Sequence, residues 1–195
     1  MRKQLSFGQY RTIDLVLFAL MLAVFEFIII SAATRWFPDQ LYTVSLAAAI
    51  TSIVMMRWGP WGLIHAGLAG AAYCFFSGAV RVQYLMYILG NLFSAGSLVM
   101  LRLLGGERIR QSQWLSLAFG LLTWLLMCLG RMAMALIFGA GFGDALAFLT
   151  TDSLSAVFTL VIVWIARRLD GIFENQKHYL LRLNKEREEE KGGTL

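Results

Sequence analysis

Residues 12–33 read TIDLVLFALMLAVFEFIIISAA, and this stretch decides the class of fold. A helix needs about 20 mostly apolar residues to cross the hydrocarbon core of a bilayer, and this run is long enough. The basic residues Arg2 and Lys3 precede it, but no small-residue cleavage pattern follows, so we expect no cleavable signal peptide. The stretch therefore predicts a transmembrane helix rather than a targeting segment.

The rest of the chain has the composition of a protein built from several such helices. Of its 195 residues, 58% are hydrophobic and 15% are charged, whereas soluble domains average about 45–50% and about 25%. Further apolar segments occupy residues 41–56, 61–79, 84–104, 114–138 and 144–166. We therefore expect an all-α integral membrane protein with six transmembrane helices, of which the second is the shortest.

The distribution of positive charge predicts how these helices are oriented. If the N-terminus is cytoplasmic and the six spans alternate, Arg35 and Arg81 fall outside and Arg131 falls within a span. All the other lysines and arginines then lie on the cytoplasmic side, where short loops are normally enriched in both residues. We therefore expect both ends of the chain inside the cell. The net charge of +5 is a signal of topology rather than of nucleic-acid binding.

The chain divides into two parts of unequal size. Residues 1–167 are expected to form one six-helix transmembrane domain, because no loop within them is long enough to hold a second domain. Residues 168–195 are strongly charged and carry apolar residues at near-helical spacing, which predicts a short cytoplasmic helix that frays toward its end. The alternative for this tail is a solvated extension that only fixes the orientation of the chain.

Sequence motifs give no support for an enzyme. The chain has no GxxxxGK[ST] phosphate loop and no HExxH or GxSxG arrangement. Its two histidines, His65 and His178, are far apart, and both cysteines, Cys74 and Cys128, lie within apolar runs. We therefore expect no catalytic residue, no metal site, no cofactor and no hydrolysis of ATP by this chain.

Three ionisable residues, Glu26, Arg131 and Asp152, lie inside predicted spans. Such residues are costly in a bilayer and mark functional sites by default. Because the first and fifth spans run outward and the sixth runs inward, all three residues fall in the outer half of the membrane. The alternative is that Arg131 pairs with Asp152 or Glu26 as a structural salt bridge, which does not exclude a pocket beside it.

Aromatic and polar residues are predicted to share this layer. Tyr84, Tyr87 and Asn91 lie about one turn apart on one face of the fourth span, although the tyrosines could instead belong to an interfacial aromatic belt. The predicted substrate-binding residues are Glu26, Arg35, Trp36, Arg81, Tyr84, Tyr87, Asn91, Trp124, Arg131, Thr151 and Asp152. A layer of this kind is typical of a small-molecule pocket that opens outward.

The first span also carries a motif with a family resemblance. Residues 11–20 read RTIDLVLFAL, a basic residue followed by an apolar run, and Ala19 and Ala23 form an A-x-x-x-A pair on one helical face. With six spans and both ends inside, these features resemble the substrate-binding subunit (S-component) of an energy-coupling factor (ECF) transporter. The resemblance covers the whole chain in architecture but only the first span in motif. The charged C-terminal tail is longer than the tail expected for a member of this family.

The resemblance implies a function in uptake. Such a subunit captures a small water-soluble vitamin or related micronutrient at the outer face of a prokaryotic plasma membrane. It delivers the substrate inward together with a transmembrane coupling subunit and two ATPase subunits, which hydrolyse the ATP. By the same resemblance, Ala19 and Ala23 contact the coupling subunit. The sequence does not identify the substrate, but mixed charge and aromatic residues suit a small, polar, partly aromatic molecule.

Two other functions fit the same architecture. A non-transporting scaffold of a cell-shape complex (MreD-like) would use the spans and the tail to hold partners, and would lack a ligand pocket. An autonomous secondary carrier usually shows an internal repeat and interrupted helices near the midplane, and the sequence shows neither. Binding of a small molecule therefore separates the uptake subunit from the scaffold.

Overall fold

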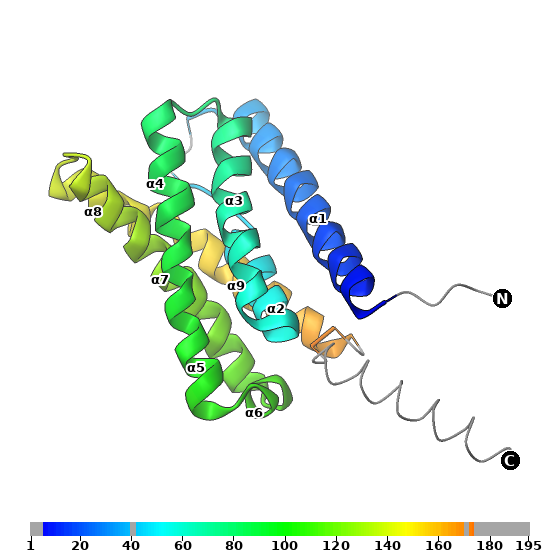
Figure 1. The fold of residues 1–195 in the computed structure, drawn as a ribbon. Helices are drawn as coiled ribbons and strands as arrows, with labels where there is room; N and C mark the ends of the chain where they lie inside the picture. Colours follow the sequence, from blue (N-terminus) through cyan, green and yellow to red (C-terminus); the bar gives the residue numbers. More distant parts are fainter. Residues whose placement is uncertain (1–5, 40–41, 170–171, 174–195) are drawn as a thin grey trace, which may run out of the picture.

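The computed structural model describes residues 6–39, 42–169 and 172–173. Every regular element in these ranges is a helix, so the predicted all-α class is confirmed for the described part of the chain (Figure 1). The elements are α1 (Phe7–Trp36), α2 (Ala47–Trp58), η1 (Gly59–Trp61), α3 (Gly62–Ser77), α4 (Arg81–Leu92), η2 (Phe93–Gly96), α5 (Ser97–Leu104), α6 (Gly106–Gln111), α7 (Gln113–Ile137), α8 (Phe142–Thr150) and α9 (Ser153–Arg168). The helix predicted within residues 168–195 lies almost entirely outside the described ranges.

Four helical segments in the described residues are long and apolar enough to cross a membrane. They are Phe7–Trp36, Arg81–Leu104, Gln113–Ile137 and Phe142–Arg168. The second comprises α4, η2 and α5, and the fourth comprises α8 and α9. These helices are what a multi-pass membrane protein requires. The remaining predicted spans are helical but shorter, because α2 has 12 residues and α3 has 16.

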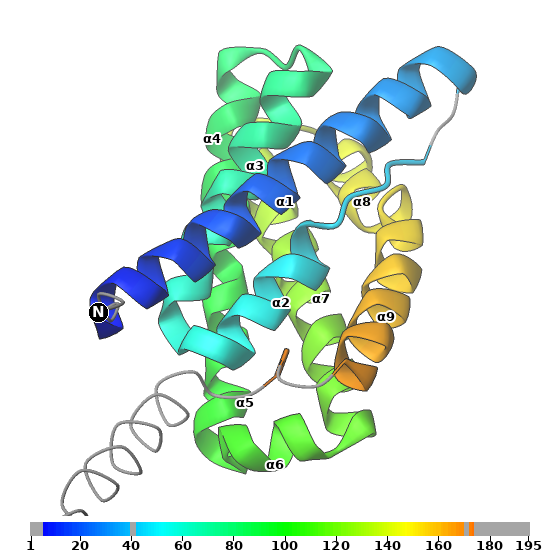
Figure 2. The ribbon, with the colours of Figure 1, turned by 90° about the vertical axis from the view of Figure 1, so that its right-hand side faces the viewer.

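Helix α1 is the longest unbroken element. Its 30 residues extend about 45 Å at 1.5 Å per residue. It begins at Phe7 because Ser6 and Gln9 form a capping box, in which each side chain accepts a hydrogen bond from the backbone N–H of the other. The helix lies obliquely across the others and packs mainly against α3 (Figure 2). Its buried residues are Leu22, Glu26 and Ile30.

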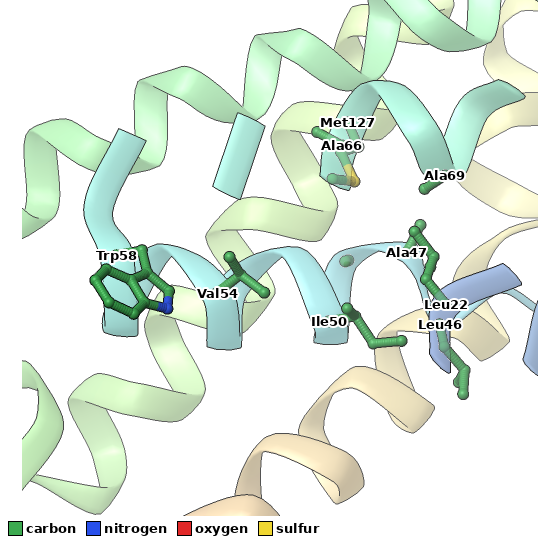
Figure 3. Packing of buried hydrophobic residues seen from close by; sticks show 10 residues of the cluster. Leu22, Leu46, Ala47, Ile50, Val54, Trp58, Ala66, Ala69 and Met127 are labelled. Atoms are coloured by element: carbon green, nitrogen blue, oxygen red, sulfur yellow. The ribbon is translucent and has the colours of Figure 1, made fainter. Parts of the chain in front are cut away.

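Helix α2 lies at the centre of the bundle. All of its residues are buried, and it packs against α1, α3, α7 and α9. Ile50, Val54 and Trp58 follow one another at one-turn intervals along it, and Ala66 of α3 and Met127 of α7 belong to the same cluster (Figure 3). A helix that is apolar on all sides is stable only when it is surrounded. Helix α2 is therefore the core around which the longer helices assemble.

The prediction of a helix beginning at residue 41 is wrong, because α2 begins only at Ala47. The preceding segment is not helical, and alternate N–H groups bond to the distant corner between α8 and α9. The N–H of Thr43 donates to the carbonyl oxygen of Thr151 at 3.0 Å, and the N–H of Ser45 donates to Ser155 Oγ at 2.9 Å. Bonding of every second residue to one neighbour is typical of an extended chain.

Two further boundaries differ from the sequence prediction. The predicted sixth span is interrupted at Thr151 and Asp152, so α8 and α9 are separate helices joined by a tight turn. Residues 105–113, which connect the predicted spans 84–104 and 114–138, contain the short helix α6. The first difference matters for the site, because the interruption leaves Asp152 at the corner with its side chain facing the bundle interior, only 3% exposed.

Glycines allow α4 to approach both of its neighbours closely. A Cβ atom on Gly70 of α3 would lie 2.7 Å from the backbone of Tyr87, and one on Gly90 of α4 would lie 2.7 Å from the backbone of Arg131. A Cβ atom on Gly130 of α7 would collide with the carbonyl oxygen of Gly90. Small residues permit such close helix crossings in a membrane environment. These crossings bring Tyr87 and Arg131 together.

A charged cluster joins α1 to the end of α2. The carboxylate of Asp14 accepts hydrogen bonds from Arg57 Nε at 2.9 Å, Arg57 Nη2 at 2.8 Å and Trp58 Nε1 at 2.6 Å. Arg57 also donates to the carbonyl oxygen of Ile172 at 2.8 Å. This cluster lies at the end of the bundle where α1 begins and α9 ends, called here the lower end after its place in Figure 1. The opposite end, where α1 ends and α4 begins, is the upper end.

Candidate functional site

Arg131 and Asp152 form a buried ion pair in the upper half of the bundle. Their Nη2 and Oδ2 atoms are 2.6 Å apart, and their side chains are 9% and 4% exposed. Cys128 Sγ lies 3.3 Å from the same Nη2 atom and 3.4 Å from the same Oδ2 atom. The structure thus pairs Arg131 with Asp152 rather than with Glu26. A buried charge pair is stable only when its remaining hydrogen-bonding groups are satisfied.

The second carboxylate oxygen of Asp152 is also hydrogen-bonded, and its partners extend a network of hydrogen bonds toward α1. Asp152 Oδ1 accepts from Ser155 Oγ at 2.5 Å and from Thr43 Oγ1 at 3.3 Å. Ser155 Oγ in turn accepts the N–H of Ser45, whose own hydroxyl donates to Glu26 Oε1 at 2.6 Å. A continuous set of hydrogen bonds therefore joins α7, α9, the segment before α2 and α1.

Glu26 is fully buried at the far end of this network. Its Oε1 atom accepts from Ser45 and from the N–H of Leu46 at 2.9 Å. Its Oε2 atom is buried without a hydrogen-bond partner. Buried polar atoms of this kind are rare and require an explanation, which a bound ligand or an ordered water can provide.

Aromatic side chains enclose the ion pair. The guanidinium carbon of Arg131 lies 5.4 Å from the ring centre of Tyr87, within the range of a cation–π contact. Tyr87 stacks on Tyr73 of α3 with ring centres 4.7 Å apart. Trp124 donates from its indole N–H to the carbonyl oxygen of Asp152 at 3.2 Å. The pair is thus shielded by rings from three helices.

A cavity of about 190 Å³ adjoins this network. Its lining is formed by Ile29, Ile30, Ala33 and Thr34 of α1, by Phe37, Pro38, Tyr42, Thr43 and Val44, and by Tyr73 and Ser77 of α3. Thr43 lines the cavity and also donates a hydrogen bond to Asp152. Tyr73 lines the cavity and stacks on Tyr87, which in turn contacts Arg131. The cavity and the ion pair are therefore parts of one region.

The predicted site residues divide into two groups. Glu26, Tyr87, Trp124, Arg131 and Asp152 come together as described, and Thr151 joins them through its carbonyl oxygen. The remaining five behave differently: Arg35, Trp36 and Arg81 are exposed, Tyr84 is partly exposed, and Asn91 is buried and donates to the carbonyl oxygen of Ala66 at 3.1 Å. Binding of a substrate by any of these residues stays a prediction.

Several residues of this region were not singled out from the sequence. Cys128 lies three residues before Arg131, and Ser155 lies three residues after Asp152, so helical spacing alone puts each beside a residue that was identified. Thr43 and Ser45 were assigned to a continuous helix. Their polar side chains at every second position are a signal of extended structure, and that signal could have found them.

Within the described residues, no group of three or more His, Cys, Asp or Glu side chains is arranged to hold a metal ion. The chain matches no family model, no curated protein and no solved structure. Its function must therefore be argued from the site itself. A cavity lined by rings and hydroxyl groups, beside a neutralised charge pair, has the chemistry of small-molecule recognition.

Proposed function

We propose that this chain is the substrate-binding subunit of an ECF-type ABC importer. It captures a small water-soluble vitamin or related micronutrient at the outer face of a prokaryotic plasma membrane. A transmembrane coupling subunit and two ATPase subunits then act with it to deliver the substrate inward. In this proposal six helical segments cross the bilayer, the short helix α2 is buried among its neighbours, and both ends of the chain are cytoplasmic.

The observation that carries the proposal is the cavity beside the Arg131–Asp152 pair. Charged residues in the apolar core of a membrane protein are costly, and an apolar pair of similar volume often stabilises a fold as well or better. The pair anchors Thr43 through Asp152, and Thr43 lines the cavity. The presence of the ion pair is therefore explained if the pair keeps the lining of a binding cavity in place.

The charges at the two ends of the bundle support the proposed orientation. Arg35 and Arg81 lie at the upper end, at the end of α1 and the start of α4. The lower end carries Arg11, Arg57, Arg102, Arg108, Arg110, Arg167 and Arg168. Because Lys and Arg are enriched on the cytoplasmic side, the lower end is assigned to the cytoplasm and the cavity to the outer half of the membrane.

The contact with the coupling subunit is proposed on α1. Val16, Leu20 and Val24 are 51%, 60% and 55% exposed and follow one another at one-turn intervals. Ala19 and Ala23 lie beside them and are partly buried. An apolar ridge next to small residues suits a close approach by a second membrane helix. The scaffold alternative would use the same ridge, so this surface alone does not separate the two functions.

Uptake by intact cells tests the proposal. Deleting the gene is expected to abolish uptake of the compound that the purified protein binds, and expression of the wild-type chain is expected to restore it. A cell-shape scaffold would instead give altered morphology with uptake unchanged. That second result would contradict the proposed function.

A further inference from the structure

The size, hydrogen-bonding groups and charge of the cavity define the kind of molecule that fits it. We infer that it takes a compact aromatic molecule that carries N–H donors and no negative charge. This inference rests on the proposed function, because it specifies the substrate class of the same site.

The dimensions of the cavity favour a single ring. An engineered apolar cavity of about 150 Å³ holds benzene, so a volume of about 190 Å³ accommodates one aromatic ring with a small polar substituent. Three aromatic side chains, Phe37, Tyr42 and Tyr73, contribute to the lining. Ring faces attract other rings and cations, and such a lining selects a planar ligand.

The aliphatic hydroxyl groups of the lining offer acceptors rather than donors. Thr34 Oγ1 already donates to the carbonyl oxygen of Ile30 at 2.9 Å, and Ser77 Oγ donates to that of Cys74 at 3.4 Å. Thr43 Oγ1 donates to Asp152 Oδ1 at 3.3 Å. Each hydroxyl has one proton but two acceptor lone pairs. A ligand that donates N–H bonds therefore matches these three hydroxyl groups, whereas a ligand that only accepts is left with the phenol hydroxyls of Tyr42 and Tyr73.

The charges around the cavity disfavour an anion. No charged side chain contributes to the described lining, and the guanidinium of Arg131 is occupied by Asp152. Glu26 lies one turn before the lining residue Ile30, and both of its hydrogen-bond donors, Ser45 and Leu46, are neutral. Among the described residues no cationic side chain forms an ion pair with Glu26, and its Oε2 atom has no hydrogen-bond partner. A carboxylate or phosphate ligand would therefore find no free cation in the described lining to bind.

Three probes of nearly the same shape test the inference on the full-length protein in detergent. Benzamidine is a planar cation with N–H donors, benzamide is its neutral analogue, and benzoate is an anion with acceptors only. Ligand-detected NMR at millimolar concentrations is expected to give the binding order benzamidine, benzamide, benzoate.

Two matched threonine variants test whether the binding order of the three probes depends on the cavity. Thr34→Val removes a lining acceptor and is expected to weaken benzamidine binding about fivefold, the effect of one ordinary hydrogen bond. Thr12→Val is the control, because Thr12 makes the same bond on the same helix, 2.9 Å to the carbonyl oxygen of Gly8, far from the cavity.

The possible contrary results are distinguishable. Benzoate binding as tightly as benzamidine, or equal effects of the two threonine variants, would overturn the inference and leave the proposed function standing. Failure of all three probes to bind would also overturn the inference. If the purified protein in addition retained no natural ligand, the proposed function would fail with it.

Discussion

The Nη2 atom of Arg131 lies 2.6 Å from Oδ2 of Asp152, and this contact joins α7 to the corner between α8 and α9. The other carboxylate oxygen of Asp152 binds Ser155 and Thr43, so the pair also holds the segment that lines the cavity. The guanidinium is thereby committed to the protein. The pair does not itself line the cavity, but it holds the lining residue Thr43 in place through Asp152.

Asp152→Ala is expected to abolish ligand binding and to lower the free energy of unfolding by about 3–5 kcal/mol, because it leaves Arg131 buried without a counter-charge. Unfolding in mixed detergent micelles measures the second effect. The double variant Arg131→Met/Asp152→Leu removes both charges and should unfold less readily than Asp152→Ala. If the double variant is no more stable than Asp152→Ala, the unpaired charge of Arg131 is not the cause of the lost stability.

Ser155→Ala tests the link between the ion pair and the cavity. The change removes the acceptor of the Ser45 N–H and a donor to Asp152. Leaving a buried N–H unsatisfied costs about 1–3 kcal/mol, and ligand binding should weaken because the neighbouring residues line the cavity. Ser153→Ala is the control, since Ser153 is exposed two residues away. Equal behaviour of the two variants in thermal unfolding and binding would refute the link.

Gly130→Ala is expected to destabilise the contact between α4 and α7. The added Cβ would collide with the carbonyl oxygen of Gly90 and press on Phe93, and overpacking of this kind costs about 1–3 kcal/mol. Gly143→Ala on α8 meets no atom within 4 Å and should be neutral, or stabilising by up to about 1 kcal/mol. Thermal denaturation compares them, and an undiminished midpoint for Gly130→Ala would contradict the close crossing.

Ala19→Trp separates ligand binding from delivery. Its bulk beside the exposed ridge of α1 should block docking of the coupling subunit, so cellular uptake is lost while the purified variant still binds ligand. Retained binding also serves as the check that the variant folds. Val157→Trp places the same ring at a 53% exposed position on α9 and should leave uptake intact. Normal uptake by Ala19→Trp would disprove the proposed docking surface.

Local properties of the sequence were enough to predict part of this fold. Length and apolar composition predicted the four long helices, because these properties alone determine whether a helix can span a bilayer. Arg131 and Asp152 could be identified from the sequence because charged residues are rare within long apolar runs. Their direct pairing was one of the alternatives that the sequence left open.

Long-range contacts account for what the sequence did not predict. The residues just before Ala47 are apolar enough to continue α2, but the N–H of Ser45 bonds to Ser155, 110 residues away. No local pattern specifies that partner. For the same reason the sequence did not single out the residues that line the cavity, which come from α1, α3, residues 37–38 and residues 42–44.

In the proposed function, the cavity beside Arg131 and Asp152 binds a small molecule. Mass spectrometry of compounds released from the freshly solubilised wild-type protein, with Asp152→Ala prepared in parallel, tests it most directly. We expect one low-mass compound at about one molecule per chain in the wild type and none in the variant. A wild-type protein that releases no compound, or a variant that retains the same compound equally well, would contradict it.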